Sequence, residues 1–389
     1  MLTPRTNLTR RIVAAVDASP SRIPVLVGGC GSGRTTLLQQ LRDRLGRTSA
    51  QFIDIERTAT TPERFLRALA ATSPFPVSEA APAGARGAFD ATLAFFARAR
   101  SSAGEPATFL LDEFLELRTF ESFPGLRQVL HELVDSLANS GNRFVLTSRY
   151  VARTLRLLRD ASARFEVIHV PQLTAEDVLD ILGAVQVPDA PDAEFAARTV
   201  HALADGRPAY VHALTEALVA MREHSGAGDP ISALAGLLAP GGSLAKQCAF
   251  CYELRLHRAR GYGALKAILE ILADEENLTL TEISQRLQRT PGSTKDYLSW
   301  LEDVDLVQSR QKRYSFTDAL LRVWVRLHCR AQAPTDDDLA REVHRYALPR
   351  LPQQLTPQPQ PRPEPALALA VAGGAADEDR KEWGIIEID

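Results

Sequence analysis

Apolar residues in the first half of the chain gather in short runs, and segments with an apolar residue every three or four positions separate these runs. The runs predict five strands, at residues 23–27, 51–56, 107–112, 143–147 and 165–170. The spaced segments predict helices at residues 35–45, 61–71, 88–99 and 126–139. Strands that alternate with helices form parallel sheets, whose strands are buried on both faces and almost continuously apolar. We therefore expect an α/β core with a five-stranded parallel sheet.

The pattern changes after Pro171, where the spacing predicts only short helices up to about residue 221. A helix at 244–260 then leads into a compact unit, whose predicted order of three helices and a hairpin is that of a winged helix-turn-helix. From residue 352 the chain is Pro/Gln-rich, then Ala-rich, then charged, which cannot bury a core. The predicted divisions are a core at 1–172, a helical segment at 173–240, a winged unit at 241–333, a linker at 334–382 that is mostly disordered from 352, and a terminal peptide at 383–389.

The first predicted strand leads into a glycine-rich loop. It follows the pattern Gly, four residues, Gly, Lys, Ser/Thr, except that Arg34 replaces the lysine. Such loops point backbone N–H groups at phosphate oxygens, and the helix behind them favours an anion. Thr35 would place its hydroxyl on Mg²⁺, and Arg34, a candidate catalytic residue, would reach the terminal phosphates of ATP. The predicted nucleotide-binding residues of the loop are Gly28, Gly29, Cys30, Gly31, Ser32, Gly33, Arg34, Thr35 and Thr36.

Arginine is larger than lysine. Its charge is spread over a forked guanidinium group, whereas the charge of lysine is concentrated on a compact ammonium group. ATP binding is therefore a safer expectation than ATP hydrolysis. The alternative to a phosphate-binding loop is an ordinary glycine-rich turn between a strand and a helix.

Polar residues also follow the third and fourth predicted strands. Asp112 would hold a water on Mg²⁺, and Glu113 would accept a proton from the attacking water. Ser148 could touch the γ-phosphate and Arg149 could sense its charge, or both could be a strand-end cap and a solvated arginine. The turn before residue 209 could bring Pro208 near the nucleotide. Gly and Pro are, however, also common at the start of a helix for structural reasons alone.

These elements, in this order, resemble the archaeal-type ATPase branch of the AAA+/STAND nucleotide switches, whose relatives include origin-recognition ATPases. The resemblance covers roughly residues 8–330. Besides the loop and the polar strand ends, it rests on Gly206-Arg207-Pro208, which matches the Gly-x-Pro signature of the helical lid. Residues 313–326 are similar to the end of a winged domain. The resemblance implies a five-stranded ATP-binding core, a helical lid and a winged helix-turn-helix domain that act as an ATP-dependent switch with Mg²⁺.

Composition limits the partners and the compartment. A net charge of −3 gives no global field toward nucleic acid or an anionic membrane, and no apolar run is long enough to span one. The N-terminus lacks the apolar core of a signal peptide, so we expect a cytoplasmic protein. Cysteines at 30, 248, 251 and 329 should then be reduced. Cys248 and Cys251 could belong to a zinc site, but their helical spacing favours buried apolar positions.

The charge of the winged unit argues against a strong DNA-binding surface. Residues 263–330 contain ten Lys/Arg and ten Asp/Glu, and the third helix carries one lysine and two acids. DNA binding needs several cations on one face. Arg310, Lys312 and Arg313 at the predicted wing tip could supply only a modest patch. DNA is therefore a possible partner but not the favoured one.

The chain ends in an apolar-acidic peptide, with Trp383, Ile386 and Ile388 as candidate anchors for a protein partner. Alternating Ile and acidic residues suit a strand added to a partner's sheet, or one that docks on this protein's own core. The favoured hypothesis is an ATP-binding switch with slow or impaired hydrolysis that engages a partner through the winged unit and the tail. The alternatives are an ATP-controlled DNA-binding initiator or regulator and a pseudo-ATPase scaffold, and a homo-oligomer stays open.

Overall fold

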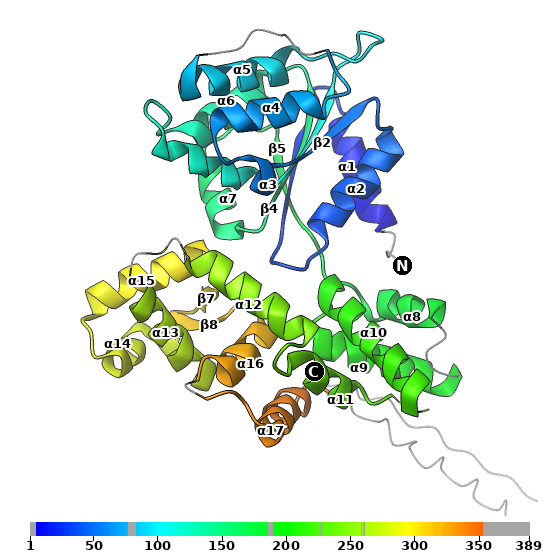
Figure 1. Cartoon of the computed structure of the whole chain (residues 1–389), viewed down its shortest axis with the longest axis vertical. Coiled ribbons are helices and arrows are strands. Elements are labelled where there is room, and N and C mark those ends of the chain that lie inside the picture. The colour runs from blue at the N-terminus through cyan, green and yellow to red at the C-terminus, as the bar shows by residue number, and fades with distance from the viewer. Residues whose placement is uncertain are drawn as a thin grey trace, which may run out of the picture. The chain divides into compact units, whose positions relative to one another are not determined.

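The computed structural model describes residues 5–76, 83–185, 190–225, 228–257, 259, 261–330 and 332–352 (Figure 1). The candidate anchors Trp383, Ile386 and Ile388 lie outside these residues, as does almost all of the segment predicted to be disordered. None of the helices in the described part of the chain has the length and apolar character that crossing a bilayer requires.

The five predicted strands form one parallel sheet in the order β2-β3-β4-β1-β5. Their bounds are β1 Ile23–Val27, β2 Ala50–Asp54, β3 Thr108–Asp112, β4 Arg143–Ser148 and β5 Phe165–His169. The predicted fold class is thereby confirmed for the core. Because β4 lies between β1 and β3, the loops that follow these three strands meet at one edge of the sheet. The carboxyl edge is where open α/β sheets bind their ligands.

Successive residues of the central strands face two different hydrophobic cores, as the pleat of a strand requires. In β3, Phe109 and Leu111 belong to one core and Leu110 to the other. On one face of the sheet, the first core includes side chains of α4 (Pro62–Ala71), α5 (Gly84–Arg98) and α6 (Val129–Asn139) (Figure 1). On the other face, the second core includes side chains of α1 (Thr6–Val16) and α2 (Arg34–Leu45). The sheet is therefore covered on both faces, and the loops at its carboxyl edge are the part of the core that can contact a ligand.

Capping residues explain why two element boundaries differ from the prediction. Strand β2 ends at Asp54, because its carboxylate accepts a hydrogen bond from the backbone N–H of Arg57 at 3.0 Å and starts the short helix α3 (Ile55–Thr58). Helix α15 (Pro291–Asp303) begins three residues before Thr294, the predicted start of the third helix of the winged unit. Thr290 caps it and proline stands at its first position, where the missing N–H costs nothing. The 3₁₀ helix η1 (Phe114–Ser122), the helix α7 (Val151–Leu157) and α1 were not predicted.

The all-helical segment contains α8 (Ala175–Ala184), α9 (Ala190–Ala204), α10 (Pro208–Ser225) and α11 (Pro230–Leu238). These helices share a hydrophobic core that includes Leu182, Val200, Leu214 and Leu234. Thr174 and Asp177 form a capping box at the start of α8. We call these four helices the lid.

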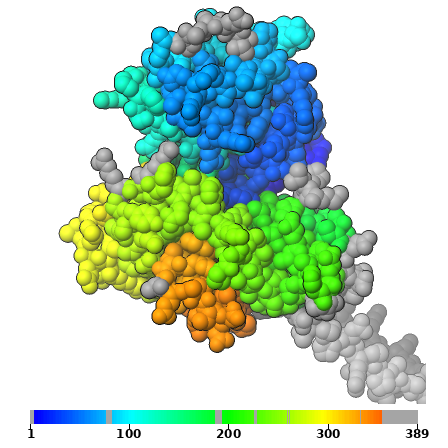
Figure 2. All heavy atoms as spheres, viewed as in Figure 1, coloured from blue at the N-terminus to red at the C-terminus, as the bar shows by residue number. Residues whose placement is uncertain are grey.

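The predicted linker is wrong between residues 336 and 347, which form the helix α17 (Asp336–Ala347). Thr335 and Asp338 cap this helix, and its apolar stripe of Leu339, Val343 and Tyr346 packs into the core of the lid. Figure 2 shows α17 in orange against the green lid helices. The segment was mistaken for a linker because charged residues outnumber this narrow stripe.

The unit after the lid has the helices and hairpin expected of a winged helix-turn-helix. Its elements are α12 (Ser243–Leu256), α13 (Tyr262–Asp274), β6 (Leu278–Thr279), α14 (Leu280–Leu287), α15, β7 (Val307–Arg310), β8 (Arg313–Phe316) and α16 (Ala319–His328). The strands form an antiparallel sheet in the order β6-β8-β7. The hairpin turns at Gln311 and Lys312, which both have positive φ angles, as the tightest hairpin turns require.

The two cysteines of α12 occupy the buried positions that their helical spacing predicts. Cys248 and Cys251 are buried in α12, and no disulfide joins the four cysteines. Within the described ranges, no three His, Cys, Asp or Glu side chains are grouped closely enough to hold a metal ion.

Candidate nucleotide-binding site

The glycine-rich loop connects β1 to α2 at the carboxyl edge of the sheet. Gly31 and Gly33 have φ angles of 76° and 83°, a backbone conformation that favours glycine. A side chain at Gly31 would also collide with the lid, because its Cβ would lie 2.9 Å from the Cβ of Ala209. The glycines are therefore needed both for the shape of the loop and for the close approach of the lid.

The structure brings together the two residues that were predicted to hold Mg²⁺. The hydroxyl of Thr35 donates a hydrogen bond to a carboxylate oxygen of Asp112 at 2.7 Å. The hydroxyl of Thr147 donates to the other oxygen of Asp112 and accepts the backbone N–H of Glu113 at 2.9 Å. Burial raises the pKa of Asp112, against the lowering effect of these two hydroxyls. Hydroxyl and carboxylate oxygens are the ligands that Mg²⁺ takes from proteins.

Glu113, the candidate general base, is buried between two arginines. Its backbone has a φ of 54°, and the residue is 5% exposed. One carboxylate oxygen accepts a hydrogen bond from Arg34 at 2.6 Å. The other lies 3.2 Å from Nε of Arg149 and accepts the backbone N–H of Arg149 at 2.9 Å. Burial raises the pKa of Glu113, but the charges of Arg34 and Arg149 outweigh it, so that the pKa is lowered overall.

Arg34, predicted to reach the terminal phosphates of ATP, lines the cavity beside the loop, and in this structure its side chain is engaged by protein acceptors. Besides pairing with Glu113, its guanidinium donates to the carbonyl oxygens of Gly28 and Gly29 and, at 2.8 Å, to the hydroxyl of Ser32. A guanidinium has five N–H donors in a fixed fork, and the loop supplies the acceptors. One terminal nitrogen of Arg34 makes the three loop contacts, and the other makes the contact with Glu113.

The polar end of β4 is also engaged within the protein. The hydroxyl of Ser148 is buried and accepts the backbone N–H of Tyr150 at 3.1 Å, so it caps its own turn. Arg149 forms ion pairs with Glu56 and Glu113 and is 5% exposed. Both residues lie at the predicted edge of the sheet, with side chains turned to protein partners.

The lid contacts the loop directly through the start of α10. The backbone N–H of Ala209 donates to the carbonyl oxygen of Gly31 at 3.1 Å, and the ring of Pro208 lies beside Gly33. Arg207 donates to the carbonyl oxygen of Cys30 at 3.4 Å and forms an ion pair with Asp318 at 3.2 Å. The loop, the lid and the start of α16 are therefore linked by one set of polar contacts.

A cavity of about 290 Å³ lies between the loop, the start of α2 and the lid. It is lined by residues 31–37 of the loop and helix, including Thr36, and by Pro208 of the lid. Sequence reasoning missed Arg5 and His212, which line the same cavity. Both terminal nitrogens of Arg5 are buried without a hydrogen-bond partner in the described part of the chain. Neither residue belongs to a motif, so only the fold could reveal them.

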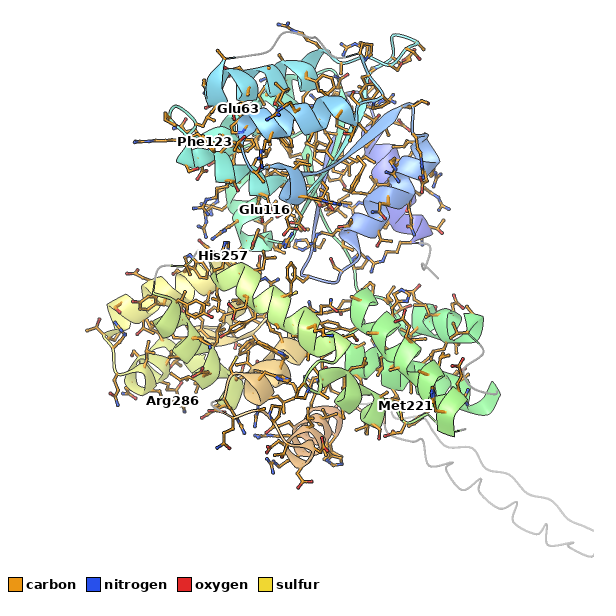
Figure 3. The ribbon with its side chains drawn as sticks, in the orientation of Figure 1. Glu63, Glu116, Phe123, Met221, His257 and Arg286 are labelled. Carbon is orange, nitrogen blue, oxygen red and sulfur yellow. The ribbon has the colours of Figure 1, made fainter. Side chains whose placement is uncertain are left out.

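A second cavity of about 570 Å³ lies away from the loop, between η1, α7, α12 and α15. Glu116 and His257, labelled in Figure 3, line it from η1 and from the end of α12. No predicted site residue lines this cavity, so the chemistry expected from the sequence belongs to the smaller one.

Comparisons with known proteins identify the fold. No family model matches the sequence, and no curated protein matches it. A Walker-type ATPase of Pyrococcus abyssi matches with a TM-score of 0.62 at 17% identity, over 84% of this chain and 96% of that chain. Cdc6p of Pyrobaculum aerophilum matches with a TM-score of 0.43 at 12% identity, over 90% of this chain and 97% of that one. A RuvB variant of Thermotoga maritima matches with 0.42 at 15%, over 82% of this chain and 93% of that one. The chain therefore has the fold of a Walker-type P-loop ATPase, and the predicted resemblance is confirmed at that level.

Proposed function

We propose that this chain is an ATP-binding switch of the AAA+/STAND type with slow or impaired hydrolysis, which couples its nucleotide state to a protein partner. One observation carries the proposal: Arg34, in the place of the usual lysine, pairs with Glu113, in the place of the usual base, at 2.6 Å. The residue expected to bind phosphate and the residue expected to activate water are therefore joined in one ion pair.

The cavity beside the loop supports nucleotide binding. Thr35 and Asp112 present adjacent oxygen atoms that suit Mg²⁺, and bound Mg²⁺ would neutralise phosphate charge there. The start of α2 favours an anion. Arg5, whose terminal nitrogens have no hydrogen-bond partner among the described residues, and His212 also line this cavity, where they could contact the nucleoside or a phosphate.

The surroundings of Glu113 support slow hydrolysis. A general base needs a free lone pair near the water and a pKa close to the working pH. Here both carboxylate oxygens accept hydrogen bonds from arginines, and the two arginine charges lower the pKa of Glu113 below its ordinary value. Both contacts stabilise the carboxylate form of Glu113 and so weaken it as a base.

The same pair supports a switch. The phosphates of ATP and the carboxylate of Glu113 compete for the guanidinium of Arg34, so ATP binding would release Glu113 and redirect Arg34. The loop also contacts the lid through Gly31 and Ala209 and contacts Arg207 through the carbonyl oxygen of Cys30. A change in the loop would therefore be transmitted to the lid and, through the pair of Arg207 with Asp318, to α16.

The C-terminal peptide is the candidate site for the partner. We propose that residues 383–389 bind the edge strand of a partner's sheet, with Trp383, Ile386 and Ile388 as anchors. Deleting these seven residues should leave ATP binding and the melting temperature unchanged while removing a partner from pull-downs. A fall of several degrees in the melting temperature would instead assign the peptide to this protein's own fold.

The test of nucleotide binding is calorimetry with Mg-ATP on the full-length protein and two variants. Arg34→Ala should abolish binding. Arg47→Ala removes an arginine whose side chain is 74% exposed and should bind like the parent. Equal affinity of the parent and Arg34→Ala would refute the assignment. Turnover measured with and without duplex DNA then separates the switch from a DNA-binding initiator, for which DNA should change the rate or the affinity.

A further inference from the structure

The larger cavity, of about 570 Å³, has walls from two parts of the fold. Residues of η1, α6 and α7 line it from the core, and residues of α12 and α15 line it from the winged unit. Two contacts join these walls: Arg156 pairs with Asp303, and a carboxylate oxygen of Asp305 accepts the backbone N–H of Ala152 at 3.4 Å. A cavity of this size accommodates a small organic molecule. Such a molecule would touch the core and the winged unit at the same time.

The lining of this cavity carries more arginine than carboxylate charge. It includes four arginines, two histidines and three acids. Two of the arginines pair with two of the acids near the surface: Arg118 with Glu121, and Arg156 with Asp303. Arg153, Arg255 and the third acid, Glu116, complete the set. The cavity therefore has an excess of positive charge, which favours an anionic ligand.

Arg255 is the most buried of the four arginines, with 5% of its surface exposed. Its Nε has no hydrogen-bond partner among the described residues, and none of the ion pairs that these residues form includes Arg255. The carboxylate of Asp305 does not pair with it, because one oxygen accepts the backbone N–H of Ala152 and the other is buried without a partner. A buried guanidinium is costly unless an anion lies near it.

A smaller cavity, of about 380 Å³, also touches Arg255. Three acids line it, Glu302, Asp305 and Asp318, and its other arginine, Arg207, already pairs with Asp318 at 3.2 Å. These carboxylates would repel an anion. The larger cavity is therefore the one in which a bound anion would neutralise Arg255.

Arg153 brings a second guanidinium into the larger cavity, from α7. It is half-buried and lies over the ring of Tyr150, 5.2 Å from the ring centroid. Burial and the like charge of Arg118 lower the pKa of Arg153, although Tyr150 and two acids oppose them. An anion beside Arg153 would offset this repulsion. Two guanidinium groups from different helices suit the several oxygens of a phosphate group.

The remainder of the lining is mostly apolar. Leu115 and Leu130 are buried, whereas Leu157, Leu254 and the indole of Trp300 are half-buried. An apolar or aromatic group that covers the half-buried side chains would remove more of their surface from water. The lining thus combines guanidinium groups for an anion with an apolar wall for the body of a ligand.

We propose that this cavity is a second ligand site, which binds a phosphorylated small molecule with an aromatic body. The phosphate pairs with Arg153 and Arg255, and the aromatic body lies against Trp300 and the leucine side chains. The site is distinct from the glycine-rich loop, since no residue of that loop lines it.

The first experiment uses phenyl phosphate as the probe, with the full-length protein. Binding is followed by tryptophan fluorescence and by thermal unfolding, and we expect a dissociation constant of about 0.1–1 mM. A concentration of about ten times that constant should raise the melting temperature by about 2 °C. Inorganic phosphate, phenol and benzoate should each bind about 10-fold more weakly, because each lacks part of the proposed contacts. No binding of phenyl phosphate at about 10 mM, or equal binding of any of the three, would overturn the proposal.

The second experiment places the probe in the cavity. Arg153→Met and Arg255→Met should each weaken phenyl phosphate binding by about 10-fold or more, and Arg153→Lys should retain part of the affinity. Arg159→Met is the matched control, because Arg159 is exposed on the surface and lies outside the lining. Unchanged affinity in Arg153→Met would refute the site. Arg255→Met should not lower the melting temperature of the ligand-free protein, and a fall of several degrees would show that Arg255 is a structural residue instead.

The third experiment separates this site from the glycine-rich loop. Saturating Mg-ATP should leave phenyl phosphate bound, and Arg153→Met should bind Mg-ATP as the parent does. Displacement of the probe by Mg-ATP would assign it to the loop and refute a second site. If the parent binds no ATP, the proposed function fails, while the variants of Arg153 and Arg255 still decide the second site.

Discussion

Replacing Glu113 with glutamine removes one buried negative charge and little volume. In the parent this charge is shared by Arg34 at 2.6 Å and Arg149 at 3.2 Å, and all three residues are at most 7% exposed. Glutamine keeps one carbonyl oxygen for Arg34. Its amide group then faces the backbone N–H and the guanidinium of Arg149, which are also donors. The variant thus leaves a buried arginine without its counter-charge.

The size of the effect follows from these contacts. Removing one partner of a buried ion pair costs roughly 3–5 kcal/mol, and Arg149 keeps a second partner in Glu56, so we expect about 3 kcal/mol. For a unit the size of the core this lowers the melting temperature by roughly 6–12 °C. ATP should bind more tightly, by about 10- to 100-fold, because Arg34 no longer has to leave a carboxylate. Turnover, if the parent shows any, should fall by roughly 10²- to 10⁴-fold.

Thermal unfolding with and without Mg-ATP, together with calorimetry, tests these three numbers in the same preparation. Glu121→Gln is the matched control, because Glu121 pairs with Arg118 at 3.3 Å on the surface, where a pair contributes at most about 1 kcal/mol. A melting temperature and an ATP affinity that both match the parent in Glu113→Gln would refute the idea that this carboxylate restrains Arg34.

Three further predictions concern pH and charge. Glu113 has a pKa lowered below its ordinary value of 4.5, so its stabilising contribution should be complete above that pH and be lost as the pH falls through the lowered pKa; acid unfolding of the parent and of Glu113→Gln should converge there. Burial raises the pKa of Asp305 from 3.8 to about 6, so stability should fall between about pH 4 and pH 6 and stay at the lower value above that; Asp305→Asn should add roughly 1–3 kcal/mol in urea unfolding at pH 8 and nothing below about pH 4. Reversing the charges of Arg310, Lys312 and Arg313 should barely change DNA binding, which we expect to be weak in the parent; a tight, sequence-dependent complex that this change abolishes would favour the initiator hypothesis.

The sequence was sufficient for the sheet and for the meeting of its polar strand ends. Strands buried on both faces must be apolar throughout, so their positions could be recognised without knowing the order of the sheet. Thr35 and Asp112 could be paired because the carboxyl ends of parallel strands lie at one edge, and the hydrogen bond of 2.7 Å between them agrees with this reasoning.

The direction of Arg34 could not be predicted, because it depends on which acceptors the loop offers. The motif has a lysine at position 34, and that lysine reaches phosphate. A guanidinium has more N–H donors than an ammonium group, and here carbonyl oxygens of its own loop accept hydrogen bonds from it. The positions of Arg5 and His212 in the cavity could not be predicted either, because contacts between residues far apart in the sequence leave no local signal.

Charge balance around the loop connects the site with the proposed switch. The buried arginines near it are Arg34, Arg149 and Arg255, and the buried acids are Asp112, Glu113 and Asp318; Arg207, which pairs with Asp318, is partly buried. Buried charges are stable only when they are paired, so a change in one pair affects its neighbours. The phosphates of ATP would bring further negative charge to these arginines. Gain or loss of the nucleotide should therefore redistribute these ion pairs, and two of the arginines, Arg207 and Arg255, are attached to the lid and to α12. The proposed switch thus needs no element beyond the loop, its counter-charges and the two helices that carry them.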